Sequence, residues 1–225
     1  MGTVKILEQT TRKPITLIGQ MAGVCYGADV ADEAKNYRRG WDCITSGHGR
    51  TLEFPDIYME ISGYSARVIR EWYTHIGCLP TRLQESTRYV DYGDFGYITP
   101  PSIYDNKDAI EVYQTTMRAI ANAEKFLVDE LHIPREDAAM LLPLGMTTRI
   151  VDKRNLRNLI DMSRQRMCQR AYLEFRELFR DICIALMVYS EEWGKIVNTQ
   201  FHAKCQETKT CHEKHGCGKY PRREG

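Results

Sequence analysis

Three short segments of the chain bring together side chains that could bind a ligand or transfer a proton. In the first, Gly47-His48-Gly49-Arg50-Thr51-Leu52-Glu53, an imidazole and a carboxylate stand near two glycines. Both groups can hold the polar edge of a ring through hydrogen bonds. The same residue types are common in simple turns. The segment therefore has two interpretations, a ligand contact or a turn.

The second segment is Gln84-Glu85-Ser86-Thr87-Arg88-Tyr89. Its carboxamide, carboxylate and hydroxyls suit the edge of a pyrimidine, and its guanidinium suits a phosphate. The alternative is an ordinary polar loop. No histidine or lysine base stands beside Ser86 in the sequence, so we expect this hydroxyl to form hydrogen bonds and not to act as a nucleophile.

The third segment contains Arg166 and Arg170, four residues apart in a predicted helix. Residues at this spacing share a helix face, where two like charges repel unless an anion or a carboxylate neutralises them. Glu174 continues the same row. The row is either an anion-binding site or a solvated cationic face. Because the sequence has no Gly-x-Gly-x-x-Gly motif and no P-loop, nucleotide phosphates would have to be held by arginines and helix N-termini.

The elements that must position these segments are strands and long helices. Residues 14–27 are apolar, which predicts a strand that runs into a short helix. Residues 28–46 predict a helix. Residues 56–64 alternate between apolar and polar types, which predicts a half-buried strand, and residues 65–75 predict a helix after it.

The second half of the chain is mostly helical in pattern. Residues 107–131 have apolar side chains at helical spacing, and residues 152–189 predict helix nearly throughout. The chain turns polar from about Phe201. Strands and long helices without a regular alternation predict an α+β fold.

Composition excludes several classes of protein. The 225 residues include 31 basic and 30 acidic residues, giving a net charge of +1, and 43% are hydrophobic. A wholly disordered chain and a general nucleic-acid binder are both excluded by this balance. No stretch is apolar enough to span a bilayer and the N-terminus has no secretory pattern, so we expect a cytoplasmic protein with no membrane contact. Basic residues concentrate between 149 and 180, which suits a phosphorylated small molecule.

Eight cysteines lie along the chain, and without a secretory signal the first five are expected to be reduced thiols. The last three, Cys205, Cys211 and Cys217, lie in the polar segment near three histidines. Their spacing is not that of a Cys-x-x-Cys zinc knuckle, so we expect no metal there and leave zinc as the alternative.

Taken together and in order, these features resemble the flavin-dependent thymidylate synthases. The resemblance covers about residues 15 to 190, and no single segment carries it. The matching segments are Ala22-Gly23-Val24-Cys25-Tyr26, Gly47-His48, Leu52-Glu53, Arg70-Glu71-Trp72-Tyr73-Thr74-His75, Gln84 to Tyr89, Leu142-Pro143-Leu144, Thr148-Arg149-Ile150-Val151, Asn155-x-Arg157 and Arg166-x-Cys168-x-Arg170-Ala171-x-x-Glu174.

The resemblance implies a fold, a reaction and a set of ligands. The fold would be a mixed sheet flanked by long helices over residues 1–200, with residues 201–225 as a polar tail rich in Cys and His. The enzyme would be a homotetramer with active sites shared between subunits. It would methylate dUMP to dTMP with FAD as redox cofactor, NADPH as reductant and methylenetetrahydrofolate as carbon donor. No cysteine nucleophile is required in this family.

The resemblance also implies roles for individual residues. Ser86 and Arg166 would be catalytic through their contacts with the pyrimidine. The cofactor side would be formed by His48, Thr51, Glu53, His75 and Asn155. The nucleotide would be bound by Arg82, Gln84, Glu85, Ser86, Thr87, Arg88 and Arg166.

One departure from the family pattern bears on the substrate. The family's Arg-His-Arg is Thr74-His75-Ile76 here, and the loop that follows is longer. Arg82 in that loop would replace one lost cation. Two alternatives follow from this departure: a flavin-dependent methylase of another pyrimidine nucleotide such as UMP, or a homologue that binds flavin or nucleotide without turnover.

Overall fold

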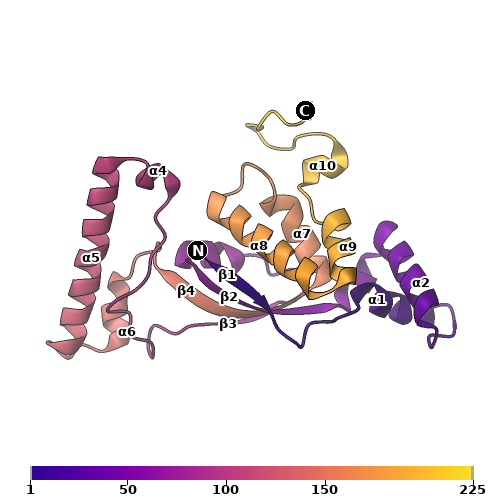
Figure 1. Ribbon diagram of the computed structural model, residues 1–225, viewed down its shortest axis with the longest axis horizontal. Helices are drawn as coiled ribbons and strands as arrows, with labels where there is room; N and C mark the ends of the chain where they lie inside the picture. The colour runs from indigo at the N-terminus through magenta and orange to yellow at the C-terminus, as the bar shows by residue number, and fades with distance from the viewer. Residues whose placement is uncertain (1, 224–225) are drawn as a thin grey trace. The chain divides into compact units, whose positions relative to one another are not determined.

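A four-stranded sheet is the centre of the computed structural model, which describes residues 2–223 (Figure 1). The strand order is β1-β2-β4-β3. Backbone hydrogen bonds join Ala66 to Met146 near one end of the β2–β4 pair and Leu156 to Pro55 near the other, so these two strands are antiparallel. The strands are β1 (Thr3–Ile6), β2 (Asp56–Ser65), β3 (Thr81–Gln84) and β4 (Thr147–Asn155). The α+β prediction is confirmed.

The chain folds as two compact units. Unit 1 contains Ile61–Thr74 and Leu83–Ile150 together with the residues up to Thr3. Unit 2 contains Val4–Glu60, His75–Arg82 and the chain from Val151 onward. Each of the four strands has residues in both units.

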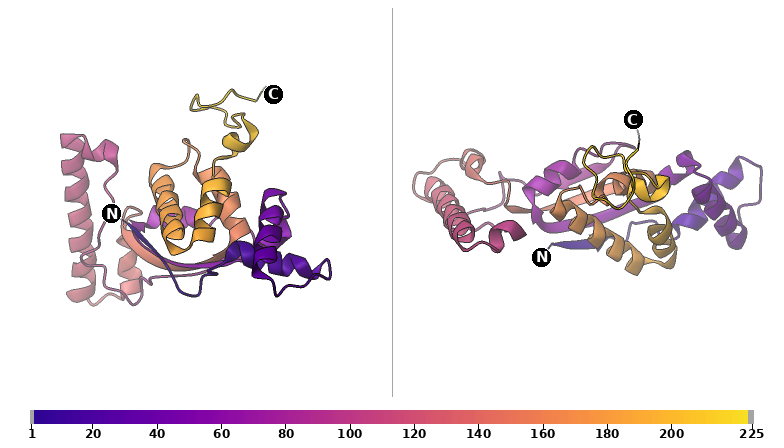
Figure 2. Two further views of the ribbon diagram at one scale, coloured as in Figure 1. Left: turned by 45° about the vertical axis from the view of Figure 1, so that its right-hand side comes forward. Right: turned by 90° about the horizontal axis from the view of Figure 1, so that it is seen from above.

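Unit 1 is built around the long helix α5 (Lys107–Asp129), with α4 (Pro101–Tyr104) before it and α6 (Arg135–Ala138) after it (Figures 1 and 2). Asn106 caps α5, because its side chain accepts hydrogen bonds from Asp108 N and Ala109 N. The predicted helix over 107–131 is therefore confirmed. The small core of this unit contains Tyr92, Phe95, Met117 and Met146.

Helix α3 (Ala66–Trp72) also belongs to unit 1. Ser65 caps it by accepting a hydrogen bond from Val68 N. The predicted helix is confirmed and ends at Trp72, whose side chain is fully buried. Strand β2 before it shows the predicted alternation, since Ile57, Met59 and Ile61 are all completely buried.

Unit 2 holds two groups of helices. Helices α7 (Leu156–Arg166), α8 (Leu173–Tyr189) and α9 (Glu191–Gln200) lie together on one side of the strands, where Phe175, Phe179 and Trp193 are completely buried (Figures 1 and 2). Helices α1 (Pro14–Val24) and α2 (Glu33–Thr45) pack against each other, and α1 also contacts α9 through hydrogen bonds to Glu192. The predicted helix over 28–46 corresponds to α2.

The strand predicted at the start of residues 14–27 is wrong, because α1 occupies this segment. Pro14 begins the helix at a position that tolerates proline, and Ile15, Ile18 and Ala22 are buried at helical spacing. Helix α1 has an apolar sequence because it packs very closely on α2. A Cβ at Gly19 would lie 1.7 Å from the Asn36 carbonyl oxygen, and one at Gly40 would lie 1.8 Å from the Ile15 carbonyl oxygen.

The continuous helix predicted over 152–189 is also wrong. Its first residues, up to Asn155, are the end of β4, in which Ile150, Asp152 and Arg154 are buried at the period of a strand. The chain then leaves α7 at Arg166 and enters α8 only at Leu173. Arg166 and Arg170 therefore do not share a helix face.

The C-terminal segment from residue 201 to residue 223 contains buried side chains as well as polar ones. Phe201, Ala203 and Cys211 are buried, and the Phe201 ring packs 5.8 Å from that of Phe179. Helix α10 (Lys204–Thr208) follows. Backbone bonds from Cys211 N to Pro221 O and from Arg223 N to Cys211 O close the last loop. Across residues 2–223, none of the helices has both the length and the apolar character needed to cross a bilayer.

Candidate functional site

A buried polar cluster in unit 2, here named the Arg154 network, comprises Asp152, Arg154, Asn158 and Met162. The Arg154 guanidinium donates to both Asp152 carboxylate oxygens at 2.5 and 2.8 Å and to Asn158 Oδ1 at 2.5 Å. Its Nη1 also lies 2.7 Å from Met162 Sδ. Arg154 and Asp152 are 1% and 0% exposed, so the bidentate pair carries charges that water cannot screen.

The Arg154 network holds the loop that follows the family's signature segment. Asn158 Nδ2 donates to the Gly77 carbonyl oxygen at 2.6 Å. The next two residues, Cys78 and Leu79, have φ values of 58° and 51°. Non-glycine residues in this left-handed region carry strain, which the surrounding contacts must offset. The loop is therefore held in one conformation by a buried anchor.

His75 and Arg166 meet in the same unit. Arg166 Nε donates to His75 Nε2 at 2.9 Å, and its guanidinium lies 4.4 Å from the centre of the Phe175 ring. Burial, followed by the charges of Arg166 and Arg154, lowers the pKa of His75 from 6.5 to about 4. The imidazole is therefore neutral near pH 7. Since Nε2 accepts a hydrogen bond, the ring proton resides on Nδ1, which is left as a donor.

Three of the five residues predicted for the cofactor side lie together, Thr51 and Glu53 on a short 3-10 helix, Gly49–Glu53, and His48 directly before it. Thr51 Oγ1 donates to the His48 carbonyl oxygen, and Arg157 Nη1 donates to Glu53 Oε1 at 2.5 Å. A cavity of about 210 Å³ lies beside this helix, lined in part by Gly47, Gly49 and Arg157. The turn interpretation of this segment and its ligand interpretation are therefore compatible.

Asn155 has a structural role as well as its predicted one. Its side chain caps α7 by accepting a hydrogen bond from Asn158 N at 3.0 Å, which fixes the position of the first turn of α7. The neighbouring Cys78 has a pKa raised chiefly by burial and by the Glu53 carboxylate. A raised pKa lowers the thiolate fraction of Cys78 and so makes this thiol a weaker nucleophile at neutral pH.

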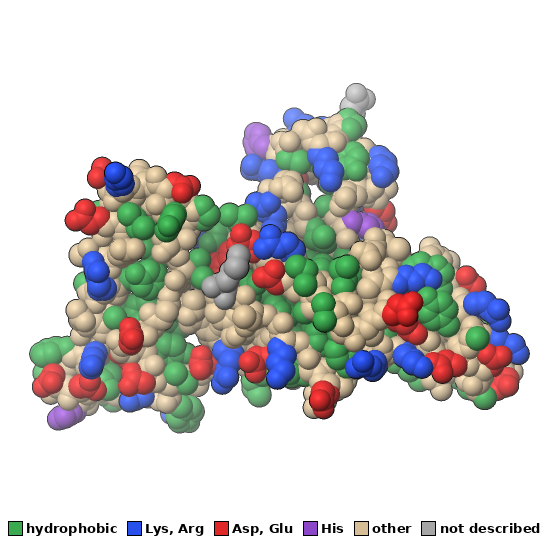
Figure 3. Space-filling view, viewed as in Figure 1, with side chains coloured by type: hydrophobic (Ala, Val, Ile, Leu, Met, Phe, Trp, Pro, Cys, Tyr) green, Lys and Arg blue, Asp and Glu red, His purple; other side chains and the backbone are tan. Residues whose placement is uncertain are grey.

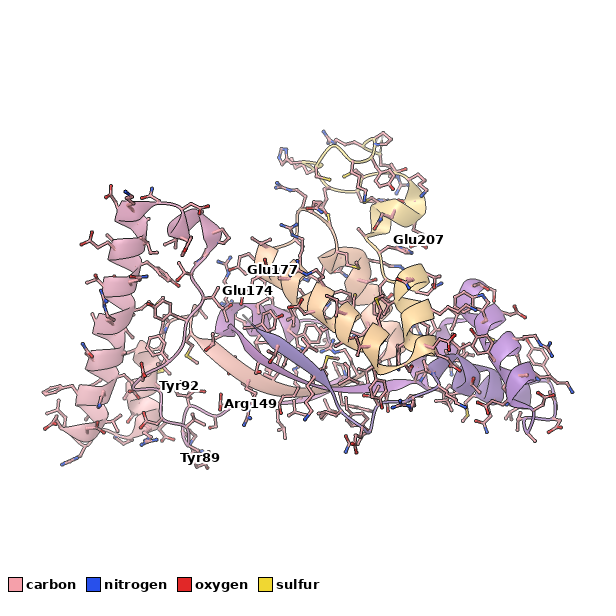
Figure 4. All side chains as sticks on the ribbon, viewed as in Figure 1. Tyr89, Tyr92, Arg149, Glu174, Glu177 and Glu207 are labelled. Carbon is pink, nitrogen blue, oxygen red and sulfur yellow. The ribbon has the colours of Figure 1, made fainter. Side chains whose placement is uncertain are left out.

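The second predicted segment, here named the polar run, covers residues 84–89 and lies in unit 1. Gln84 Nε2 donates to Thr148 Oγ1 at 3.2 Å, and Glu85 N donates to the carbonyl oxygen of Arg149, which is labelled in Figure 4. Ser86 Oγ accepts from Arg88 N at 3.2 Å. In the part of the chain that the structure describes, no base is bonded to the Ser86 hydroxyl.

Arg88 and Thr87 complete the polar run. Arg88 Nε lies 2.6 Å from Glu136 Oε2, in an exposed ion pair, while Thr87 is half-buried. The exposed Tyr89 ring lies 5.6 Å from the Arg88 guanidinium. The polar run is therefore accessible and only lightly bonded within its own unit.

Sequence reasoning missed Tyr92, which follows the polar run and is labelled with Tyr89 in Figure 4. Its side chain is 5% exposed, and among the described residues its hydroxyl has no partner at hydrogen-bond geometry. Burial and the Glu85 carboxylate raise its pKa. A buried hydroxyl left unpaired beside a predicted binding segment is a further candidate contact. An alternating pattern around residue 92 would have been the one signal of its burial, and the sequence lacks it.

The predicted site residues thus divide between the two units. Gln84, Glu85, Ser86, Thr87 and Arg88 belong to unit 1. The half-buried Arg82 belongs to unit 2 and lies in β3, so its predicted position in the loop is wrong. The other members in unit 2 are His48, Thr51, Glu53, His75, Asn155 and Arg166.

The thiols add no preformed metal centre. All eight cysteines are free. Within residues 2–223, no group of three or more His, Cys, Asp or Glu side chains is arranged to hold a metal ion. For Cys205, Cys211 and Cys217, the absence of a metal therefore stays a prediction, with zinc binding as the alternative.

Comparison with known proteins gives one consistent result. A family model described as thymidylate synthase complementing protein matches residues 5–187. The flavin-dependent thymidylate synthase of Geobacter sulfurreducens is 29% identical over 181 residues, which cover 76% of this chain and 77% of the relative. That of Nitratidesulfovibrio vulgaris is 27% identical over 242 residues, covering 98% of this chain and 96% of the relative.

Solved structures agree at the level of the fold. A crystal structure of thymidylate synthase X from Helicobacter pylori with FAD and dUMP has a TM-score of 0.66 and 18% sequence identity, and covers 88% of this chain and 99% of that one. A second structure of the same protein complexed with FAD and dUMP has a TM-score of 0.67. The shared fold is thus observed in a protein that was crystallised with both ligands.

Proposed function

This chain belongs to the flavin-dependent thymidylate synthase family and is an enzyme of that family, and from this premise we propose that it methylates dUMP to dTMP. Methylenetetrahydrofolate would donate the carbon and NADPH would supply the electrons, with FAD as the bound cofactor. The alternative substrate, UMP, is kept because both arginines that flank the central histidine of the family signature are replaced, by Thr74 and Ile76.

The contact between His75 and Arg166 is the observation that carries this proposal. The two residues are 91 positions apart, and the resemblance assigns one to the flavin and the other to the nucleotide. Their hydrogen bond joins the two proposed sites. Because His75 is neutral, it presents a donor at Nδ1 without adding a charge, while the positively charged guanidinium of Arg166 beside it would polarise a ring carbonyl.

The residues beside the 3-10 helix fit a flavin cofactor in part. Arg157, which is bonded to Glu53, offers a donor in the lining of the 210 Å³ cavity. No side-chain atom lies within 4 Å of the position that a Gly47 Cβ would take. Bound FAD would supply hydride transfer to the pyrimidine. The chain would orient it through Asn155, His48 and the Arg157–Glu53 pair.

A second subunit is part of the proposal. Sites for large ligands usually enclose about 300 to 1,000 Å³, and the cavity beside the 3-10 helix is smaller than this range. A cofactor as large as FAD therefore needs further walls. In a homotetramer with shared active sites, a neighbouring subunit would supply these walls. A neighbouring subunit would also cover the exposed polar run.

The nucleotide would be bound by the polar run. Arg88 can exchange its exposed partner Glu136 for a phosphate, because a doubly charged oxyanion competes well with one solvated carboxylate. Gln84, Glu85, Ser86 and Thr87 would contact the sugar and base. Ser86 acts by hydrogen bonding, in keeping with the lack of a bonded base among the described residues.

The test is anaerobic turnover of the purified protein with FAD, NADPH, methylenetetrahydrofolate and either dUMP or UMP, read by product mass. A methyl group gained on dUMP supports the proposal. A product from UMP alone overturns the choice of substrate, and no product from either nucleotide overturns the activity.

A matched pair of variants separates a site effect from a general loss of charge. Arg166→Gln removes the guanidinium that contacts His75, and we expect turnover to fall by about a hundredfold or more. Arg180→Gln removes an exposed guanidinium paired with Asp181 on α8, and we expect turnover to stay within about twofold of the wild type.

A further inference from the structure

The C-terminal segment and the end of α7 line a cavity. Of its lining residues, the proposed function assigns a role only to Arg166. The cavity has a volume of about 330 Å³, and all its lining residues belong to unit 2. We name this space the cationic cavity. The charged residues of its lining are Arg164, Arg166, Arg170, Lys204 and Glu213, and His212 also lines it. Figure 3 shows Lys and Arg side chains gathered over this C-terminal part of the surface.

Three chain segments supply the four basic side chains of the cavity. Arg164 and Arg166 come from the last turn of α7, Arg170 from the turn that joins α7 to α8, and Lys204 from the first turn of α10. Sequence spacing suggested that Arg166 and Arg170 share a helix face, which is wrong. They nevertheless line one cavity, because the chain turns directly after Arg166.

The positive charges in the cavity are only partly neutralised. Arg164 is paired with Asp161 at 3.1 Å and with Glu207, labelled in Figure 4, at 3.2 Å. Arg170 and Lys204 are exposed, and within residues 2–223 neither has an ion-pair partner. The single carboxylate of the lining, Glu213, cannot balance both Arg170 and Lys204.

Cations that converge on one concave surface attract anions more strongly than the same cations spread over a convex one. Guanidinium groups favour carboxylates and phosphates, because their planar donors match two oxygens at once. A volume of about 330 Å³ is also far more than the roughly 30 Å³ of one water molecule. The cavity therefore suits a charged part of a larger molecule better than a lone ion.

We propose that the cationic cavity binds the oxyanion group of an anionic co-substrate. The binding of an oxyanion follows from the cavity itself, whereas the choice of a co-substrate as its source rests on the proposed function. Arg166 lines the cavity and also contacts His75, so the occupant lies next to the proposed pyrimidine site. Two sources share this chemistry: the phosphates of NADPH and the glutamate carboxylates of the folate.

The direct test uses inorganic pyrophosphate as the probe, titrated by calorimetry into protein saturated with FAD and dUMP and, in parallel, into protein as purified. The variant Arg170→Gln/Lys204→Gln removes the two unpaired cations, and both side chains are exposed, so folding is expected to survive. The control Lys35→Gln/Arg38→Gln removes the same two charges from the exposed face of α2. We expect the cavity variant to bind pyrophosphate at least about tenfold more weakly and the control to stay within about twofold of the wild type.

Equal pyrophosphate affinity in the wild type and the cavity variant would overturn the proposal, as would an equal loss in the control. This result does not depend on turnover, so a protein inactive towards dUMP still tests the cavity.

Steady-state kinetics then identifies the source. A higher KM for NADPH in the cavity variant indicates the phosphates, and a higher KM for methylenetetrahydrofolate indicates the carboxylates. A rise in the KM for dUMP alone would show that the cavity belongs to the nucleotide site and would overturn the assignment to a co-substrate.

Discussion

The Arg154 network and the polar run are both rich in hydrogen-bonding groups, yet they differ in how those groups are satisfied. Within the network, the buried Arg154 guanidinium donates hydrogen bonds to Asp152, Asn158 and Met162. Within the polar run, Arg88 and Gln84 are exposed. The ion pair of Arg88 with Glu136 is screened by solvent, and the hydrogen bond from Gln84 to Thr148 is long, at 3.2 Å. The network is complete before any ligand arrives, whereas the polar run has capacity left for one. The first can set geometry, and the second can recognise a ligand.

The largest expected effect comes from breaking the Arg154 network. Arg154→Met removes the cation and leaves the buried Asp152 carboxylate without its bidentate partner. We expect the free energy of unfolding to fall by about 3 to 5 kcal/mol, because an uncompensated buried charge is costly. Urea denaturation measures this change. The double variant Asp152→Asn/Arg154→Met should recover part of the loss. A single-variant loss below about 1 kcal/mol would contradict the view that the network is preformed.

The second effect concerns pH, through His75, which the network and Arg166 surround with positive charge. Its pKa is about 4 when folded and ordinarily 6.5. The unfolded chain therefore binds a proton at this residue first as the pH falls, so the free energy of unfolding decreases between pH 6.5 and pH 4 and the loss is complete below that range. Allowing for the solvent that reaches the ring, we expect His75 to account for about 1 to 2 kcal/mol of this loss.

The variant His75→Gln keeps a hydrogen-bond acceptor for Arg166 and cannot titrate. Urea denaturation of both proteins between pH 4 and pH 7 should therefore show a smaller pH dependence in the variant. Parallel curves for the two proteins would mean that His75 is not held neutral by its surroundings.

The third prediction addresses the polar run. Arg88→Ala removes an exposed guanidinium, so we expect the free energy of unfolding to change by less than about 1 kcal/mol, while the Kd for dUMP rises by about tenfold. Arg118→Ala, which removes an exposed guanidinium on α5, is the matched control and should change neither quantity. A loss of stability without a loss of affinity would make the polar run structural, like the network.

The smallest effect tests the loop that the network anchors. Leu79 is 90% exposed and has a φ of 51°, so Leu79→Gly loses little packing and relieves backbone strain. We expect the melting temperature to rise slightly, corresponding to about 0.5 kcal/mol. Leu83→Gly, at a position 77% exposed in β3 where φ is not positive, should lower it instead. The same sign in both variants would show that the loop carries no strain.

Parts of the fold with regular periodicity could be predicted from the sequence. Strand β2 and helix α5 have alternation and capping residues that indicate their type directly. The start of residues 152–189 could not be assigned, because Asp152 and Arg154 are charged and yet buried in β4. Their hydropathy predicts that both side chains are exposed. Burial is possible because the two charges pair with each other, and hydropathy does not record such a pair.

The candidate site shows the same limit. Ligand contacts could be proposed for the 3-10 helix and the polar run, from the chemistry of their residue types and from the family resemblance. The contact between His75 and Arg166 could not, because 91 residues separate them and no local pattern records which side chains the fold brings together. The sequence offered Arg166 and Arg170 as one interpretation of an anion site. It did not predict the cavity or its other cations, because these depend on a turn after α7 that no glycine or proline marks.

The close approach of α1 and α2 bears on which substitutions this chain can accept over evolutionary time. Even one added methyl group at Gly19 or Gly40 would collide with a backbone carbonyl of the facing helix, and backbone cannot rotate away as a side chain can. In a saturation-mutagenesis screen for folded protein, these two positions should tolerate no other amino acid. The exposed Gly27 and Gly47, which have open space around them, should be limited only by their positive φ and should accept asparagine.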